Sequence, residues 1–296
     1  MKNIFLAISL MFSSAILAQD YKAEFSRYFP KDTLKQREVL EAWEKAKPND
    51  AELYTSYYNY YFFKSKEEIV SLTTEVPEGE ALILTDSLGK TAGYMGSQLF
   101  YDENLLQKAM EKIDKGIELF PDRLDMRFGK IYGLQQAKKW QQFTDEIVKA
   151  IQYSKINKNQ WTWTNNEKWE GTEVDFLASI QDYQYALYNT EDDALLPNMR
   201  TIAEEVLKVY PNSVENLSNI AITYLLTEEY DKAIDFLKKA EKINPKDCIV
   251  LNNIAESYKR KGDKENAIKY YEKVIKNGNE QDIEHAKYNI EELKEK

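Results

Sequence analysis

The clearest regularity in the chain is an order of apolar and small residues that occurs twice in its C-terminal third. Pro211 and Pro245 stand 34 residues apart and bound the first copy. The first copy carries Leu217, Ile220, Ala221, Tyr224, Ala233, Leu237 and Ala240, and the second carries Leu251, Ile254, Ala255, Tyr258, Ala267, Tyr271 and Val274. Because the alanines let two antiparallel helices approach closely and the larger residues fill the gaps between neighbouring pairs, each copy predicts one helix pair. Gly262 and Asp263 predict the tight turn inside the second pair.

This order resembles the tetratricopeptide repeat (TPR) family, whose 34-residue pattern runs from a large apolar residue through Leu-Gly, Tyr, Ala, an aromatic residue and Ala to Pro. The segment 214–247 keeps nearly all of these features, and in 248–279 Asn279 replaces the closing proline. The resemblance implies an all-α fold, a right-handed TPR α-solenoid of about five helix pairs with extra N-terminal and C-terminal helices and a small β-hairpin insertion.

Upstream of residue 214 the same pattern weakens but can still be followed. Phe128, Gly129 and Tyr132 match a first helix, and Met199 occupies a position that the family gives to a small residue. The predicted helix pairs are 50–64 with 101–119, 122–136 with 139–156, 173–189 with 194–209, 214–226 with 230–243, and 248–260 with 264–276. One further helix is expected near 32–46, and a capping helix with a charged outer face near 280–294. The chain then divides into a signal peptide (1–18), an N-terminal helical segment (19–49) and an interrupted first repeat (50–121). Two degenerate repeats follow, the first with the Trp-rich loop (122–171) and the second without it (172–213). Two well-matched repeats (214–247 and 248–279) and a capping helix (280–296) complete the chain.

Two segments interrupt the repeats. The first, near 65–100, contains two short apolar runs on either side of Asp86-Ser87-Leu88-Gly89, and Asp and Gly at such a position predict the turn of a β-hairpin. Just before this insertion, Tyr54, Tyr57, Tyr58 and Tyr61 recur at helical spacing, which favours a packed aromatic stripe over a binding surface.

The second interruption, 159–171, holds three of the five tryptophans in the chain. Trp161, Trp163 and Trp169 have two interpretations, an aromatic platform for a glycan or peptide, or a loop that covers an imperfect joint between two degenerate repeats. Since tryptophans bury large areas and the flanking repeats match poorly, we favour packing, with Trp169 the most exposed of the three.

The N-terminus has the three parts of a secretory signal peptide over 1–18. Lys2 is followed by the apolar run from Ile4 to Phe12 and then by small residues up to Ala18. This run is shorter than the ~20 apolar residues of a membrane span. We therefore expect a protein exported to the periplasm or secreted, without an integral membrane segment in the mature chain. The alternative is an N-terminal helix that is not cleaved.

Charge and composition exclude several classes of function. Without Lys2 the 40 basic residues become 39 against 50 acidic ones, a net charge of −11, which argues against nucleic-acid binding. His285 is the only histidine and Cys248 the only cysteine, so a multi-histidine metal site and an intrachain disulfide are both excluded. We expect no metal and no cofactor.

Catalytic patterns are scarce. Ser87-Leu88-Gly89-Lys90 fits Ser-x-x-Lys, but it lies in a predicted turn and its companion motifs are missing. The protein is therefore expected not to be an enzyme, with an undetected carboxylate-based site as the remaining alternative. Cys248 opens a helix, which would lower its pKa, yet no basic neighbour supports redox chemistry.

The family resemblance implies binding of a protein or peptide partner through the concave face formed by the first helices. In one groove type of the family, lysine, arginine and asparagine side chains grip a peptide carboxylate. The corresponding positions here are Gln184, Tyr188, Asn219, Ile249 and Asn253, of which Asn219 alone matches. The candidate binding residues are Tyr188, Asn219, Asn252, Asn253, Trp161, Trp163 and Trp169. A glycan-binding accessory protein that uses the Trp-rich and Tyr-rich surfaces is the alternative function.

Overall fold

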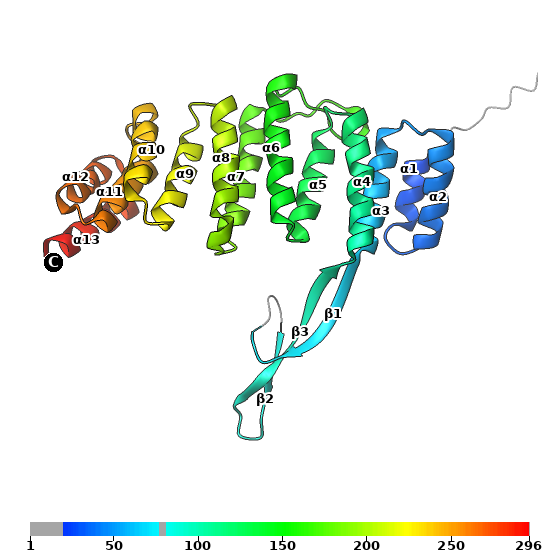
Figure 1. The fold of residues 1–296 in the computed structure, drawn as a ribbon, viewed down its shortest axis with the longest axis horizontal. Coiled ribbons are helices and arrows are strands. Elements are labelled where there is room, and N and C mark those ends of the chain that lie inside the picture. Colours follow the sequence, from blue (N-terminus) through cyan, green and yellow to red (C-terminus); the bar gives the residue numbers. More distant parts are fainter. Residues whose placement is uncertain (1–19, 77–80, 296) are drawn as a thin grey trace, which may run out of the picture. The chain divides into compact units, whose positions relative to one another are not determined.

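The computed structural model of the protein describes residues 20–76 and 81–295. These residues form thirteen α-helices, two short 3-10 helices and one three-stranded sheet (Figure 1). The chain divides into two compact units, Met1–Lys112 and Ile113–Lys296. The predicted signal peptide lies outside the described residues. Within the described residues, no helix is both long enough and apolar enough to cross a membrane.

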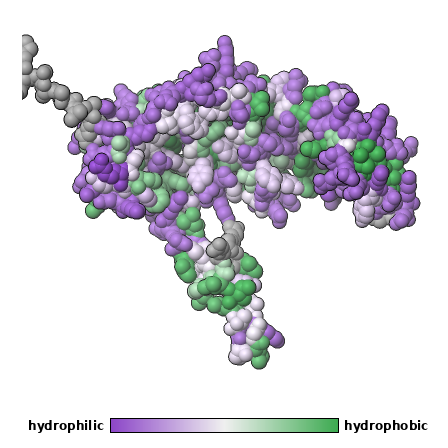
Figure 2. All heavy atoms as spheres, turned by 180° about the vertical axis from the view of Figure 1, so that it is seen from behind, coloured by the Kyte–Doolittle hydropathy of each residue, from purple (hydrophilic) through white to green (hydrophobic). Residues whose placement is uncertain are grey.

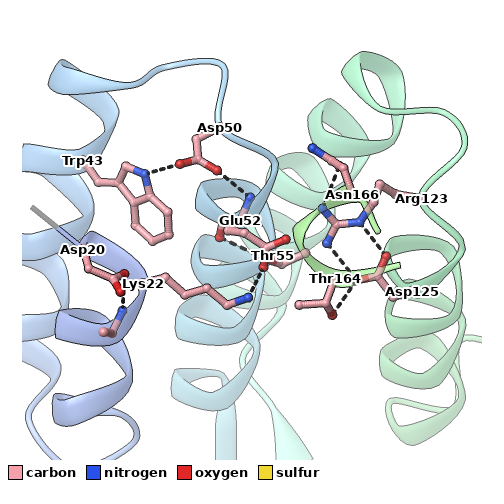
Figure 3. A network of polar contacts seen from close by, with 11 residues as sticks. Asp20, Lys22, Trp43, Asp50, Glu52, Thr55, Arg123, Asp125, Thr164 and Asn166 are labelled. Carbon is pink, nitrogen blue, oxygen red and sulfur yellow. Dashed lines mark hydrogen bonds and ion pairs between the residues drawn. The ribbon is translucent and has the colours of Figure 1, made fainter. Parts of the chain in front are cut away.

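The first unit begins with three helices, α1 (Tyr21–Tyr28), α2 (Thr33–Ala46) and α3 (Ala51–Lys64). Each starts at an aspartate, Asp20, Asp32 or Asp50, whose carboxylate accepts a backbone N–H of the first turn and so caps a donor that the helix leaves free. Asp50 also accepts the indole N–H of Trp43 at 3.0 Å, and Lys22 of α1 pairs with Glu52 of α3 at 2.8 Å (Figure 3). The helix expected near 32–46 is confirmed as α2, whereas α1 was not predicted.

The aromatic stripe of α3 packs into the core of this unit, as its spacing predicted. Tyr57 lies in one buried cluster with Phe25 and Trp43, and only Tyr61 of the stripe is partly exposed. The hydroxyl of Tyr57 donates to the Glu44 carboxylate at 2.8 Å. Lys112, on the part of α4 (Glu103–Leu119) that belongs to this unit, donates to Glu44 at 2.8 Å and lies 3.8 Å from the centre of the Tyr57 ring. These contacts join the two predicted halves of the interrupted first repeat.

The insertion between α3 and α4 is a three-stranded antiparallel sheet. Its strands are β1 (Lys66–Thr73), β2 (Ala81–Thr85) and β3 (Thr91–Tyr101), in the order β1-β3-β2. The predicted hairpin is β2 with β3, and Asp86 shapes its turn by accepting the backbone N–H groups of Leu88 and Lys90 at 2.8 and 2.9 Å. Gly89 has a φ of +77°, which favours glycine. The third strand, β1, was not predicted.

The second unit is a stack of helix pairs. The pairs are α5 (Leu124–Gln136) with α6 (Trp140–Asn157), α7 (Glu173–Tyr188) with α8 (Leu196–Val209), α9 (Val214–Leu226) with α10 (Tyr230–Ile243), and α11 (Cys248–Lys261) with α12 (Lys264–Asn277), followed by α13 (Glu280–Glu295). Two 3-10 turns, η1 (Thr164–Asn166) and η2 (Asp193–Leu195), lie in the connections. The α-solenoid predicted from the repeat pattern is therefore confirmed.

The close helix contacts arise at the predicted small residues. Ala221, Ala233, Ala240, Ala255 and Ala267 are all buried in one continuous core. At the turn between α11 and α12, Gly262 adopts a φ of +86° and Asp263 caps the next helix by accepting the N–H of Asn266 at 3.1 Å. The two well-matched repeats thus have both the core and the turn that their sequence predicts.

The degenerate second pair is joined partly by buried charge. Lys130 of α5 donates to the carboxylate of Glu146 on α6 at 2.9 Å and also pairs with Asp114. Burial lowers the pKa of Lys130, but the negative charges of Glu146 and Asp114 more than offset that effect and leave it above its ordinary value. These ion pairs supply contacts that the weak apolar pattern of this pair lacks.

Candidate binding surfaces

The Trp-rich loop is anchored by Trp161, which is only 2 % exposed. Its ring stacks on Phe176 of α7, with centroids 5.6 Å apart and planes 24° apart, and lies 5.7 Å from Tyr153 of α6. The indole N–H donates to the Asn159 side chain at 3.3 Å. Trp161 therefore fills the joint between α6 and α7, and the packing interpretation holds for this residue.

Backbone and charged contacts fix the same loop to the start of α5. Thr162 donates its N–H to the Asp122 carbonyl at 2.8 Å and accepts the N–H of Leu124 at 3.0 Å. The guanidinium of Arg123, itself buried, donates to both carboxylate oxygens of Asp125 at 2.8 Å and to Asn166 of the loop at 3.1 Å (Figure 3). The bidentate pair with Asp125 fixes the orientation of the Arg123 guanidinium, which can then hold Asn166. The loop is therefore packed firmly against the start of α5.

The other two tryptophans differ from the expectation. Trp163 is 37 % exposed, and its ring meets that of Phe128 edge to face with centroids 6.4 Å apart. Trp169 is partly buried, so Trp163 and not Trp169 is the most exposed of the three tryptophans. The reason is Gly171, where an added Cβ would lie 2.2 Å from Cζ2 of Trp169. The Trp169 ring covers the Gly171 backbone. The three rings therefore do not form one exposed aromatic surface.

Among the asparagines on the first helices, Asn219 of α9 is 5 % exposed and exchanges two amide hydrogen bonds with Gln181 of α7, at 2.8 and 3.3 Å. One turn further along α7, Gln184 donates to Asn216 at 2.9 Å. These amide pairs join two consecutive first helices. Asn219, the single position that matched the carboxylate-gripping pattern, thus uses its hydrogen-bonding groups inside the protein.

Asn252 and Asn253 of α11 are half-buried. The side-chain oxygen of Asn252 is buried and finds no hydrogen-bond partner among the described residues. The backbone carbonyl of Asn253 accepts the Ser257 hydroxyl at 2.7 Å. Both are therefore only partly accessible at the surface of α11, where Ile249 is 72 % exposed.

Tyr188, at the end of α7, is 45 % exposed and lines a cavity of about 220 Å³. Apolar side chains form much of the cavity, namely Leu187, Leu195, Leu196, Met199 and Leu226. Glu191, Asp192 and Asp193 add carboxylates, and within the described part of the chain no basic residue lines it. The sequence shows the acidic run, but only the fold brings Leu226 of the next repeat beside it.

The structure offers no support for catalysis or metal binding at the remaining candidates. Burial raises the pKa of the Cys248 thiol, and Asp282 and Asp247 raise it further, so the lowering expected at a helix start does not occur. Across residues 20–76 and 81–295, no group of three His, Cys, Asp or Glu side chains is placed to hold a metal ion.

Comparison with known proteins gives a family and several similar folds. Residues 214–247 and 250–277 match the tetratricopeptide repeat family model, and none of the curated proteins compared matches the chain. Among solved structures, YrrB, described as a TPR protein with an unusual peptide-binding site, is 15 % identical with a TM-score of 0.41, over 84 % of this chain and 97 % of that one.

Two further structures are similar at the same level. The Sgt2 TPR domain of Aspergillus fumigatus is 20 % identical with a TM-score of 0.35, over 42 % of this chain and 84 % of that one. A thermophilic TPR protein of Thermus thermophilus is 14 % identical with a TM-score of 0.37, over 63 % and 89 %. These low scores carry no argument about a binding mode. The chain therefore contains two tetratricopeptide repeats, at 214–247 and 250–277, within a stack of helix pairs.

Proposed function

We propose that the protein is an exported, non-enzymatic scaffold that binds a protein partner through the concave face of its repeats, and that Tyr188 lies at the centre of the contact. The observation that carries this proposal is the exposed tyrosine beside an apolar cavity, since buried aromatic anchors in pockets dominate most protein interfaces. Carboxylates at the same cavity favour a basic side chain next to the apolar group of the partner.

Other exposed apolar residues on the first helices extend the surface. Tyr185 precedes Tyr188 by nearly one turn of α7 and is 60 % exposed, and Ile249 on α11 is also exposed. These exposed side chains on α7 and α11 support a binding surface over the C-terminal repeats.

Site-specific crosslinking tests the binding surface. A photo-crosslinking phenylalanine derivative replaces Tyr188 in one variant and Tyr288 of α13 in another, because both tyrosines are exposed and only the first lies by the cavity. After irradiation of cells, mass spectrometry should identify one abundant protein with the Tyr188 variant and not with the Tyr288 variant. The same adducts with both variants, or none with either, would contradict a contact centred on Tyr188.

Export is supported by the three-part pattern of residues 1–18. Fractionation followed by N-terminal mass analysis tests it, and the mature chain should begin at Gln19 in the periplasmic or secreted fraction. Full-length protein confined to the cytoplasm would refute export. Glycan binding has less support, because among the three tryptophans of the loop only Trp163 exposes much of its ring.

A further inference from the structure

The inserted sheet carries an exposed apolar face. Because side chains alternate between the two faces of a strand, the pairing register places the following residues together. This apolar face consists of Val70 and Leu72 of β1, Leu82 and Leu84 of β2, and Met95 and Leu99 of β3, and the register also places Glu68 and Ser97 on it toward the end near α3, where the Ser97 hydroxyl donates to the Glu68 carboxylate. Leu72 and Leu82 both pair with Met95, so one apolar row crosses all three strands. In Figure 2 the hydrophobic surface gathers on this sheet.

The opposite face of the sheet is mixed in character. Glu67, Ser71, Thr73 and Gln98 lie on it together with Ile69, Ile83 and Phe100. The first face therefore carries more of the apolar residues, and an apolar sheet face is normally covered by a second layer. Within the described residues no element covers the apolar face, since Leu72 and Leu82 keep about two-thirds or more of their surface exposed.

The size of the apolar face selects one helix as its partner. Three strands spaced by ~4.8 Å give a width of about 14 Å, and the rows from Leu84 to Leu99 extend about 20 Å. This footprint of roughly 300 Å² is far below the ~800 Å² per partner of a stable dimer interface. An α-helix with its side chains is ~10–12 Å wide, and about 13 residues span 20 Å. The face thus has the width and length of a single helix of nearly four turns.

The charge of the insertion restricts the partner further. Among the described residues of the insertion, Glu67, Glu68, Glu75 and Asp86 are acidic and Lys66 and Lys90 are basic, and Glu68 lies at one end of the apolar face. The Lys66 ammonium lies 5.0 Å from the centre of the Phe62 ring, at the base of the sheet. This acidic border favours a basic partner and repels both an anionic membrane and a second copy of the same insertion.

From this face and its border, we propose that the inserted sheet binds an amphipathic helix of a partner protein, with the apolar side of the helix on Val70, Leu72, Leu82, Leu84, Met95 and Leu99 and with basic residues along its flanks. This site lies outside the proposed Tyr188 surface and does not depend on it. Exposed apolar patches mark interaction sites, and a bound helix would remove this one from water.

A defined peptide tests the proposal on the full mature chain. The probe is a fluorescein-labelled 14-residue peptide of leucine and lysine, with the leucines at helical spacing so that the helix has one apolar side. Its binding is followed by fluorescence anisotropy. Leu82→Lys is compared with Ile83→Lys, because the two residues are neighbours on β2, are both 63 % exposed, gain the same charge and lie on opposite faces. Circular dichroism confirms that both variants fold.

Wild-type protein and Ile83→Lys should bind the peptide alike, and Leu82→Lys should weaken binding about tenfold or more, as loss of a central apolar contact does. Two control peptides, one with the same composition in scrambled order and one with glutamate in place of lysine, should bind the wild-type protein no more tightly than the original peptide binds Leu82→Lys. Equal binding of either control peptide, or equal loss in both protein variants, would overturn the proposal. Two other results would overturn the proposal: a wild-type dimer seen by light scattering, or flotation of the wild-type protein with zwitterionic vesicles, if Leu82→Lys abolishes it and Ile83→Lys does not.

Discussion

Replacing Trp161 with alanine tests whether the Trp-rich loop belongs to the core of the second unit. The side chain is almost fully buried, stacks on Phe176 and lies 5.9 Å below the Arg127 guanidinium. Removing the ring leaves a cavity between α6 and α7 and removes the contact that joins them through the loop. The matched control is Trp163→Ala, because that tryptophan is in the same loop but already 37 % exposed.

The expected magnitudes separate the two variants. Replacing a buried tryptophan with alanine costs about 3–5 kcal/mol, the sum of lost transfer free energy and the cavity left behind. For Trp163, whose ring is partly in water and touches Phe128 at its edge, we expect about 1–2 kcal/mol. Since a domain is stable by only about 5–15 kcal/mol, the first loss is a large share of the total and the second is not.

Urea denaturation followed by far-UV circular dichroism measures both effects, because helix content does not depend on which tryptophan is missing. Each variant is compared with wild type for the free energy of unfolding. In a solenoid the loss can remain local, so hydrogen exchange of α6 and α7 should show the same order of effects. Equal or reversed losses for Trp161→Ala and Trp163→Ala would refute the conclusion that the loop packs through Trp161.

Four further predictions concern the C-terminal repeats. Ala233→Leu forces apart a contact in which Ala233 is fully buried, and we expect a loss of about 1–3 kcal/mol in urea denaturation; an unchanged midpoint would contradict the close helix contact. Gly262→Val requires a β-branched residue at a φ of +86° and should lower the free energy of unfolding by about 1–2 kcal/mol or more, measured the same way, with no loss counting against the turn geometry. Burial raises the pKa of Glu241, but the Lys273 hydrogen bond and the Lys238 charge more than offset burial and hold this pKa below its ordinary value of 4.5. The ionised carboxylate therefore stabilises the fold above pH 4.5, and this stabilisation is lost as the pH falls through the folded-state pKa. Glu241→Gln should flatten the acid side of the profile of unfolding free energy against pH. The segment 214–296, with two well-matched repeats and α13, should unfold cooperatively when expressed alone, and absence of a thermal transition by circular dichroism would refute this.

The sequence alone indicated the helical repeats because their signals are local. The repeated order of apolar and small residues and the Gly262-Asp263 turn can be read within one 34-residue window, so they predict the helix ends of the two C-terminal repeats closely. Asp86 and Gly89 likewise indicated the hairpin of β2 and β3. Strand β1 was missed because only three of its eight residues, Ile69, Val70 and Leu72, are apolar, and its partner β3 lies beyond β2 in the chain.

Tertiary structure decided which candidate residues are available to a partner. Asn219 and Tyr188 are both on first helices, but Gln181 of the neighbouring repeat pairs with Asn219, while Leu226 builds a cavity beside Tyr188. Trp161 and Trp163 are two residues apart, yet Phe176 covers the first and leaves the second partly in water. Repeat pattern and helix ends depend on neighbours along the chain. Exposure depends on residues from other helices, and those contacts exist only once the helices have packed.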